Sequence, residues 1–179
     1  MLQIVVPTVE YWDEANEEFI KKDPQTLQLE HSLVSISKWE SKWQKPFLAQ
    51  SEKTNEEILD YVRCMTITKN VDPEVYTRLS DENINTIDRY IESPMTATRI
   101  TDRRKRRSGH RIITSELIYY WMISYGIPVE FQKWHLNRLL TLIRVCEAEN
   151  NPKKMSQKEI LAQNAALNEA RKRQMGSKG

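Results

Sequence analysis

Residues 128–149, PVEFQKWHLNRLLTLIRVCEAE, hold more large apolar side chains than any other stretch of helix length in the sequence. Its apolar positions cover well over half of a helical circumference, and its polar positions recur every three or four residues. A helix that is apolar around most of its axis normally lies at the centre of a globular core. The stretch is too charged to cross a bilayer, which needs about 20 mostly apolar residues. We therefore expect a central helix that opens at Pro128, orders the core and carries no chemistry of its own.

The first thirty residues have the pattern of short strands. Residues 2–6 are a β-branched run closed by Pro7, and residues 26–30 alternate with period two. Between them, residues 9–12 and 19–22 flank a polar tip and predict a hairpin. So few strands are not stable alone, so they must pack on helices.

From Ser32 onward the apolar residues take helical spacing. Besides the central helix, we expect helices in residues 32–45, 54–65, 73–79, 80–93, 114–125 and 156–175. Thr54 with Glu57 forms a capping box, in which the two side chains satisfy free amides at the start of a helix. Thr114 or Ser115 caps the helix that ends at Gly126.

These patterns predict a mainly α fold. We expect a single helical domain in residues 1–150, with a small N-terminal element of a β-hairpin and short strands, and a basic C-terminal helix in residues 151–179. The last helix is only weakly apolar and follows Pro152-Lys153-Lys154. That profile is typical of a projecting arm that docks on a partner; a packed terminal helix is the alternative.

The composition limits the class of protein but does not indicate a function. Hydrophobic residues make up 39% and charged residues 29%, as in a well-solvated ordered protein, and a net charge of +2 does not by itself imply a polyanionic partner. Cys64 and Cys146 both fall on apolar helix faces, and buried thiols suit a reducing compartment. The first residues lack the pattern of a secretory signal. We therefore expect a cytoplasmic protein without a membrane segment.

No arrangement of residues in the sequence indicates catalysis. His31, His110 and His135 are far apart, and none has metal-ligand spacing with Cys, Asp or Glu. Nucleophile motifs, Walker loops and dinucleotide loops are missing. We therefore expect no enzyme, no metal and no cofactor, and we interpret His135 as a satisfied core or boundary histidine.

Positive charge gathers in two places that could bind partners. The loop at residues 99–111 holds the run Arg103, Arg104, Lys105, Arg106 and Arg107. Such a run could neutralise phosphates, although no aromatic residue is interleaved with it, and a solvated loop or one that meets an acidic protein surface is the alternative. On the C-terminal helix the candidate contacts are Ile160, Leu161, Leu167, Arg171, Lys172 and Arg173. Cations in a last turn also suit the helix dipole, which gives them a purely structural interpretation.

Three blocks of the sequence resemble a known group of proteins. They are residues 29–47, with SKWESKWQKPF, residues 113–156, with ITSELIYYWM, WHLNRLL and KKMS, and residues 164–171, NAALNEAR. The chain resembles small bacteriophage virion-morphogenesis proteins of the tail assembly chaperone group of long-tailed phages. The resemblance implies a non-enzymatic protein that coats the tape-measure protein and recruits tail-tube subunits in the cytoplasm of the infected bacterium. It also implies that a frameshifted extension would join after the last helix.

Alternatives from other classes stay open at this point. The basic loop at 99–111 could serve a nucleic-acid-binding or packaging-associated protein, or a head-tail connector that remains in the virion. Self-association is open as well.

Overall fold

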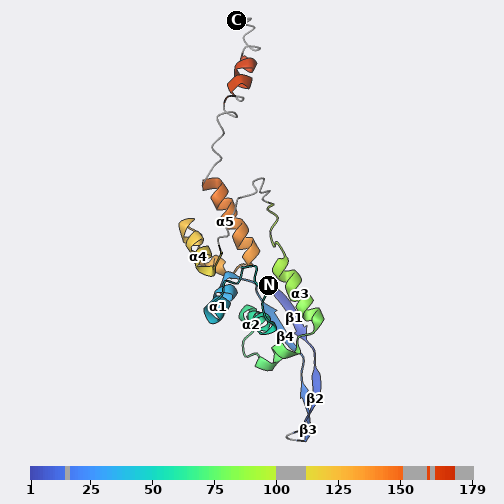
Figure 1. Cartoon of the computed structure of the whole chain (residues 1–179). Coiled ribbons are helices and arrows are strands. Elements are labelled where there is room, and N and C mark those ends of the chain that lie inside the picture. The colour runs from blue at the N-terminus through green and yellow to red at the C-terminus, as the bar shows by residue number, and fades with distance from the viewer. Residues whose placement is uncertain (15–16, 100–111, 151–160, 162–163, 172–179) are drawn as a thin grey trace. The chain divides into compact units, whose positions relative to one another are not determined.

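The computed structural model describes residues 1–14, 17–99, 112–150, 161 and 164–171. The chain divides into two compact units, Met1–Val145 and Cys146–Gly179. The first unit contains the strands and most of the helices (Figure 1). The second contains the last residues of one helix and the helical residues 164–171. The fold is mainly helical with a small antiparallel β-element, as the pattern predicts.

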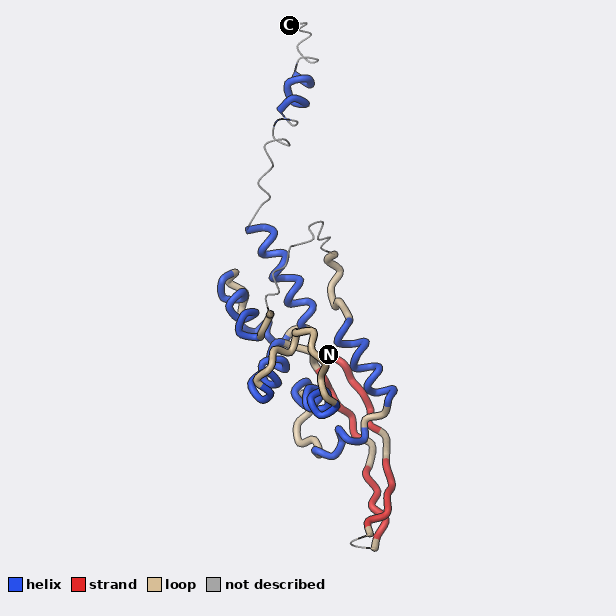
Figure 2. The backbone as a smooth tube through the Cα atoms, viewed as in Figure 1, coloured by secondary structure: helices blue, strands red, loops and turns tan. Residues whose placement is uncertain are grey.

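The N-terminal strands form one long ribbon with a single interruption (Figure 2). The strands are β1 (Leu2–Val6), β2 (Val9–Asp13), β3 (Glu18–Lys22) and β4 (Gln25–Leu29). β1 pairs antiparallel with β4, and β2 with β3, and the two residue numbers of every facing pair sum to 31. The same register places Pro7 opposite Pro24 at the interruption. Proline has no amide hydrogen to donate to a ladder, so the facing prolines divide the ribbon into two parts. The predicted strands and hairpin are confirmed.

The helical elements follow in chain order. They are α1 (Leu33–Trp43), α2 (Asn55–Met65), the 3₁₀ helix η1 (Pro73–Arg78), α3 (Asp81–Glu92), α4 (Ser115–Ser124), the 3₁₀ helix η2 (Val129–Lys133) and α5 (Leu136–Asn150). The capping box of α2 is confirmed: the Glu57 amide donates to Thr54 Oγ1 at 3.2 Å, and the Thr54 amide donates to Glu57 Oε2 at 2.8 Å. Ser80 caps α3 in the same way, with Asn83 as its partner.

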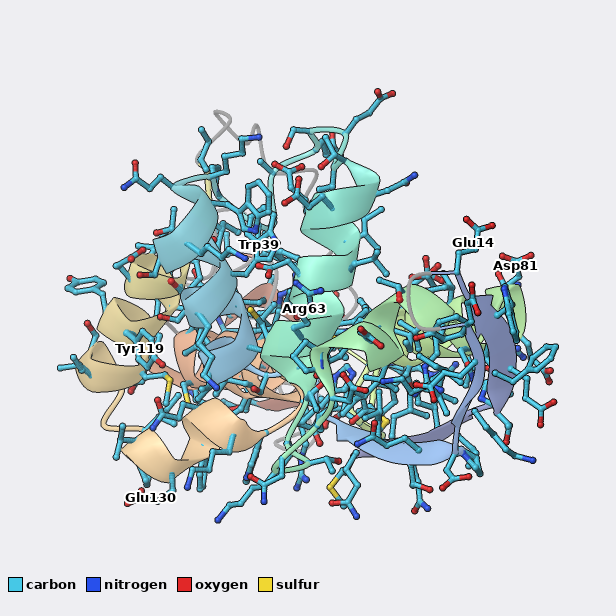
Figure 3. All side chains as sticks on the ribbon, turned by 90° about the horizontal axis from the view of Figure 1, so that it is seen from below. Glu14, Trp39, Arg63, Asp81, Tyr119 and Glu130 are labelled. Carbon is cyan, nitrogen blue, oxygen red and sulfur yellow. The ribbon has the colours of Figure 1, made fainter. Side chains whose placement is uncertain are left out.

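The core of the first unit lies between one face of the β1–β4 ribbon and the helices. Ile4, Val6, Leu27 and Leu29 alternate onto that face and are 0 to 5% exposed. The outer edge of β4 is covered by the chain after α2, where the Ile67 amide donates to the Gln28 carbonyl at 2.8 Å. Figure 3 shows Trp39 between α1 and α2, and its indole nitrogen donates to the Glu57 carbonyl at 2.8 Å.

The expected central helix at 128–149 is broken, so the prediction that it opens at Pro128 and runs unbroken is wrong. η2 ends at Lys133, Trp134 is extended with φ −69° and ψ 158°, and α5 begins only at Leu136. The Leu136 amide donates to the carbonyl of His31 at 2.7 Å, and residue 135 forms a bridge with residue 32. This long-range pairing replaces the hydrogen bonds that a continuous helix would make. In α5 the fully buried positions are Leu136, Leu139 and Ile143.

The start of α4 is capped from another helix. Thr114 stands at the N-cap position, but its side chain makes no capping hydrogen bond. The Ser115 amide instead donates to Oε2 of Glu40 on α1 at 2.7 Å, and the Phe47 amide donates to Oε1 of the same carboxylate at 2.8 Å. The expected cap by Thr114 or Ser115 is therefore corrected. Gly126, with φ +64°, ends α4 as predicted.

The environment of the two cysteines differs from the expectation. Cys64 and Cys146 are free thiols that are only partly buried, so the expectation of fully buried thiols is wrong. Cys64 packs half-buried against the edge of the core, and burial, with the nearby charge of Asp60, raises the pKa of its thiol. Within the described ranges, no helix combines the length and apolar character that a membrane span requires.

Candidate partner-binding surfaces

The most concentrated cluster of polar side chains is buried in the first unit. His31 follows β4 and is 2% exposed, and its Nδ1 lies 2.5 Å from the hydroxyl of Tyr61, which is 3% exposed. Ser35 Oγ lies 3.4 Å from the same hydroxyl. The ring of His135 packs edge-on against that of His31, with 5.1 Å between the centroids. Two histidines that are remote in sequence therefore meet in the core.

His135 is held by backbone groups on both sides of its ring. Its Nε2 lies 2.9 Å from the Tyr90 carbonyl, and its Nδ1 accepts from the Asn137 amide at 3.3 Å. Because a carbonyl only accepts and an amide only donates, the ring is neutral with its proton on Nε2. The interpretation of His135 as a satisfied core histidine is confirmed.

Burial keeps both rings uncharged near neutral pH. Burial, with a smaller contribution from the neighbouring His135, lowers the pKa of His31 to about 3. Burial also lowers the pKa of His135, against the raising effect of its bond to the Tyr90 carbonyl. Burial raises the pKa of Tyr61 as well. His135 is bonded to backbone groups and His31 to Tyr61, so the cluster joins β4, α1, α2, α3 and α5. These buried side chains present no charged acid or base to solvent.

The network reaches the surface at Glu30. The Tyr90 hydroxyl donates to Glu30 Oε1 at 2.6 Å, and the amino group of Met1 lies 2.9 Å from Oε2. This carboxylate therefore ties α3 and the N-terminus to the end of β4. Among the residues that the structure describes, no group of three or more His, Cys, Asp or Glu side chains could hold a metal ion.

One helix leaves large apolar side chains in solvent. Tyr120 and Ile123 on α4 are 62% and 79% exposed, and Glu116 in the first turn is exposed beside them. Residues three and four apart share one side of a helix, so Glu116, Tyr120 and Ile123 form one stripe, which we name the α4 face. Tyr119 is turned the other way: its hydroxyl donates to Gln132 Oε1 at 2.8 Å and holds η2 beside α4 (Figure 3).

A second exposed apolar surface lies on the β2–β3 hairpin, residues 9–22. Trp12 and Phe19 face each other across the strands with 4.9 Å between ring centroids, and they are 47% and 78% exposed. On the opposite face, Tyr11 is 41% exposed. Figure 1 shows β2 and β3 extending beyond the helices of the first unit.

The partner residues predicted from sequence fall mostly outside the described residues. That is the case for Arg103, Arg104, Lys105, Arg106, Arg107, Ile160, Lys172 and Arg173. Leu161, Leu167 and Arg171 lie on helical residues of the second unit and are exposed, Leu161 by 65% and Leu167 by 49%. The roles of both groups stay predictions.

Sequence reasoning missed the α4 face and the aromatic pair of the hairpin. Nearly every side of α4 is apolar, so no stripe in its sequence marks which side is buried. The alternation of β2 and β3 could have identified Trp12 and Phe19 as one face. Comparison with known proteins finds no matching family model, no matching curated protein and no matching solved structure.

Proposed function

We propose that the chain is a non-enzymatic phage tail assembly chaperone, which binds the tape-measure protein and brings tail-tube subunits to it. The observation that carries the proposal is the α4 face, where the helix presents Tyr120 and Ile123 to solvent. An exposed apolar stripe of this kind suits a partner that lays its own amphipathic helix against it. The resemblance of the chain to tail assembly chaperones supplies the identity of that partner.

The chemistry of the α4 face supports a helical protein partner. Burying a side chain such as Ile123 contributes about 1.5–3 kcal/mol, so two such residues can anchor a contact. α4 includes Glu116 and no Lys or Arg. The one charged residue of the α4 face therefore favours a partner helix that carries a cation beside its apolar side.

The buried carboxylates support a non-enzymatic role, because they bind groups of neighbouring segments and so hold the helices together. Asp60 accepts from Lys42 and from the Trp43 indole at 2.9 Å. Glu57 accepts from Lys45 and caps α2, and Glu40 binds two backbone amides. Carboxylates engaged in this way stabilise the scaffold and are not positioned to act on a substrate.

The proposal is tested by co-expressing the chain with the tape-measure protein of the same genome. We expect the tape-measure protein to move into the soluble fraction and to co-purify with the chain. A tape-measure protein that stays insoluble would contradict the proposal. Mass spectrometry of purified particles supplies the second arm, since a chaperone leaves before the tail is complete, whereas a connector protein would be found there.

A further inference from the structure

The start of α5 is tied to the start of α1 by backbone hydrogen bonds. Residue 135 forms an antiparallel bridge with residue 32, and the Leu136 amide donates to the His31 carbonyl at 2.7 Å. Ser32 is the N-cap of α1. The amino-terminal ends of the two helices therefore meet at residues 31–32 and 135–136, which we name the α1–α5 junction.

His135 occupies the N-cap position of α5. It stands directly before Leu136, the first residue of the helix, and its carbonyl accepts from the Leu139 amide at 3.1 Å. Its ring Nδ1 accepts from the Asn137 amide at 3.3 Å, and so satisfies an amide that has no partner within the helix. Ser, Thr and Asn, which are common capping residues, keep their acceptor at every ordinary pH, whereas a histidine loses it on protonation. The cap of α5 therefore depends on the protonation state of one ring.

Protonation of His135 reverses the chemistry of this cap. Nδ1 then carries a hydrogen, so it faces the Asn137 amide as donor against donor. The new charge lies where two helix amino-termini meet, and each of these ends has a positive partial charge. The neighbouring His31 ring gives no compensation from its Nδ1, which lies 2.5 Å from the Tyr61 hydroxyl. A charged ring is therefore disfavoured in the closed junction.

Other groups act on the charge of the same ring from α3, from the residue after β4 and from the N-terminus. Burial lowers the pKa of His135, the Tyr90 carbonyl and the Glu30 carboxylate raise it, and the amino group of Met1 lowers it. The Glu30 carboxylate already accepts from the Tyr90 hydroxyl at 2.6 Å and lies 2.9 Å from the Met1 amino group. Burial is the largest of these effects, so the ring binds a proton less readily in the closed junction than in solvent.

We propose that His135 is a pH-sensitive switch, which holds the α1–α5 junction closed while its ring is neutral and releases the start of α5 when the ring takes up a proton. In the released form the Leu136 and Asn137 amides lose their acceptors, while the rest of the first unit stays folded. An opening confined to a helix end costs less than unfolding of the whole unit, so it occurs first as pH falls. The inference does not depend on the proposed function.

The pH range follows from the proton binding of the two forms. In the open form the ring has the ordinary pKa of 6.5, whereas in the closed form the pKa is lower. Below pH 6.5 the open form therefore binds more protons, and its population rises as pH decreases. Above pH 6.5 both forms are neutral, and the junction is most stable there.

The test is hydrogen exchange of single amides in the full chain, followed by NMR at several pH values and corrected for the intrinsic pH dependence of exchange. We expect the protection of the Leu136 and Asn137 amides to fall at least about threefold between pH 6.5 and pH 5.5, measured relative to the amides of α2. Protection that falls no more at these two amides than in α2 would overturn the proposal.

Two variants separate the proton from the cap. His135→Asn supplies a side-chain acceptor that does not titrate, so the start of α5 should keep the same relative protection at both pH values. His31→Gln is the matched control, because it removes the neighbouring ring and leaves His135, so the loss of protection at low pH should persist. An undiminished loss in His135→Asn, or its disappearance in His31→Gln, would refute the role of His135. The wild-type series decides the proposal by itself if His135→Asn does not fold.

Discussion

At the scale of single residues, His31 and His135 make the free energy of unfolding depend on pH. Both rings are neutral in the folded chain and have a lowered pKa, to about 3 for His31, whereas the unfolded chain binds protons near the ordinary value of 6.5. Below that value the unfolded state binds more protons than the folded state. The free energy of unfolding is therefore highest above pH 6.5 and falls as pH decreases.

We expect the free energy of unfolding to fall between pH 6.5 and pH 5 by up to about 1.4 kcal/mol per pH unit through His31, with a contribution of the same sign from His135. Urea unfolding at closely spaced pH values measures this slope, in a range where most carboxylates stay ionised. His31→Gln removes one titrating ring and should reduce the slope even though it lowers stability at every pH. An unchanged slope in that variant would contradict the account of His31.

Glu40 is a single side chain on which three segments depend. It lies on α1 and accepts from the amides of Phe47 and Ser115, so it fixes the chain after α1 and the start of α4. A hydrogen bond to a charged group contributes about 1.5–3 kcal/mol. We expect Glu40→Gln, which loses the charge and one acceptor oxygen, to lower the free energy of unfolding by about 3 kcal/mol. The exposed Glu130→Gln is the control, with an expected change within about 0.5 kcal/mol, and equal effects of the two variants in urea unfolding would refute this role.

At the scale of elements, the sequence predicts those helices and strands whose ends are set by contacts between neighbouring residues. The hairpin follows from alternation on both sides of a polar tip, and the start of α2 follows from the Thr54–Glu57 capping box. The end of α4 follows from Gly126, whose positive φ strains other residues. In each case the deciding contacts lie within a few residues of one another, so no knowledge of the tertiary fold is needed.

The features that we predicted wrongly from the sequence depend on contacts between residues far apart in the chain. Residues 128–149 have the composition of one helix, yet the bridge between residues 32 and 135 interrupts it. The cap of α4 comes from Glu40, 75 positions away, and His31 meets His135 from still farther along the chain. A single sequence gives no signal for such pairings. The α4 face was missed for a related reason, because which side of an evenly apolar helix is covered depends on its neighbours.

For the whole molecule, a buried scaffold can be distinguished from the exposed surfaces that we propose bind partners. The buried network around His31 and the buried positions of α5 hold the first unit together, whereas the α4 face and the Trp12–Phe19 pair of the hairpin are exposed. Polar changes in the scaffold, such as Leu139→Asp at a residue that is fully buried, should therefore unfold the unit. Changes on the exposed faces should spare the fold and remove a partner.

The most direct test of the central claim compares two exposed isoleucines during co-expression with the tape-measure protein. Ile123→Asp places a carboxylate on the α4 face, and Ile67→Asp places one at a residue that is 51% exposed on the segment after α2. The quantity measured is the amount of soluble tape-measure protein that co-purifies with each variant, after circular dichroism has confirmed that both are folded. We predict a loss of at least about tenfold for Ile123→Asp and wild-type recovery for Ile67→Asp. Wild-type recovery with Ile123→Asp would contradict the claim that the α4 face binds the partner.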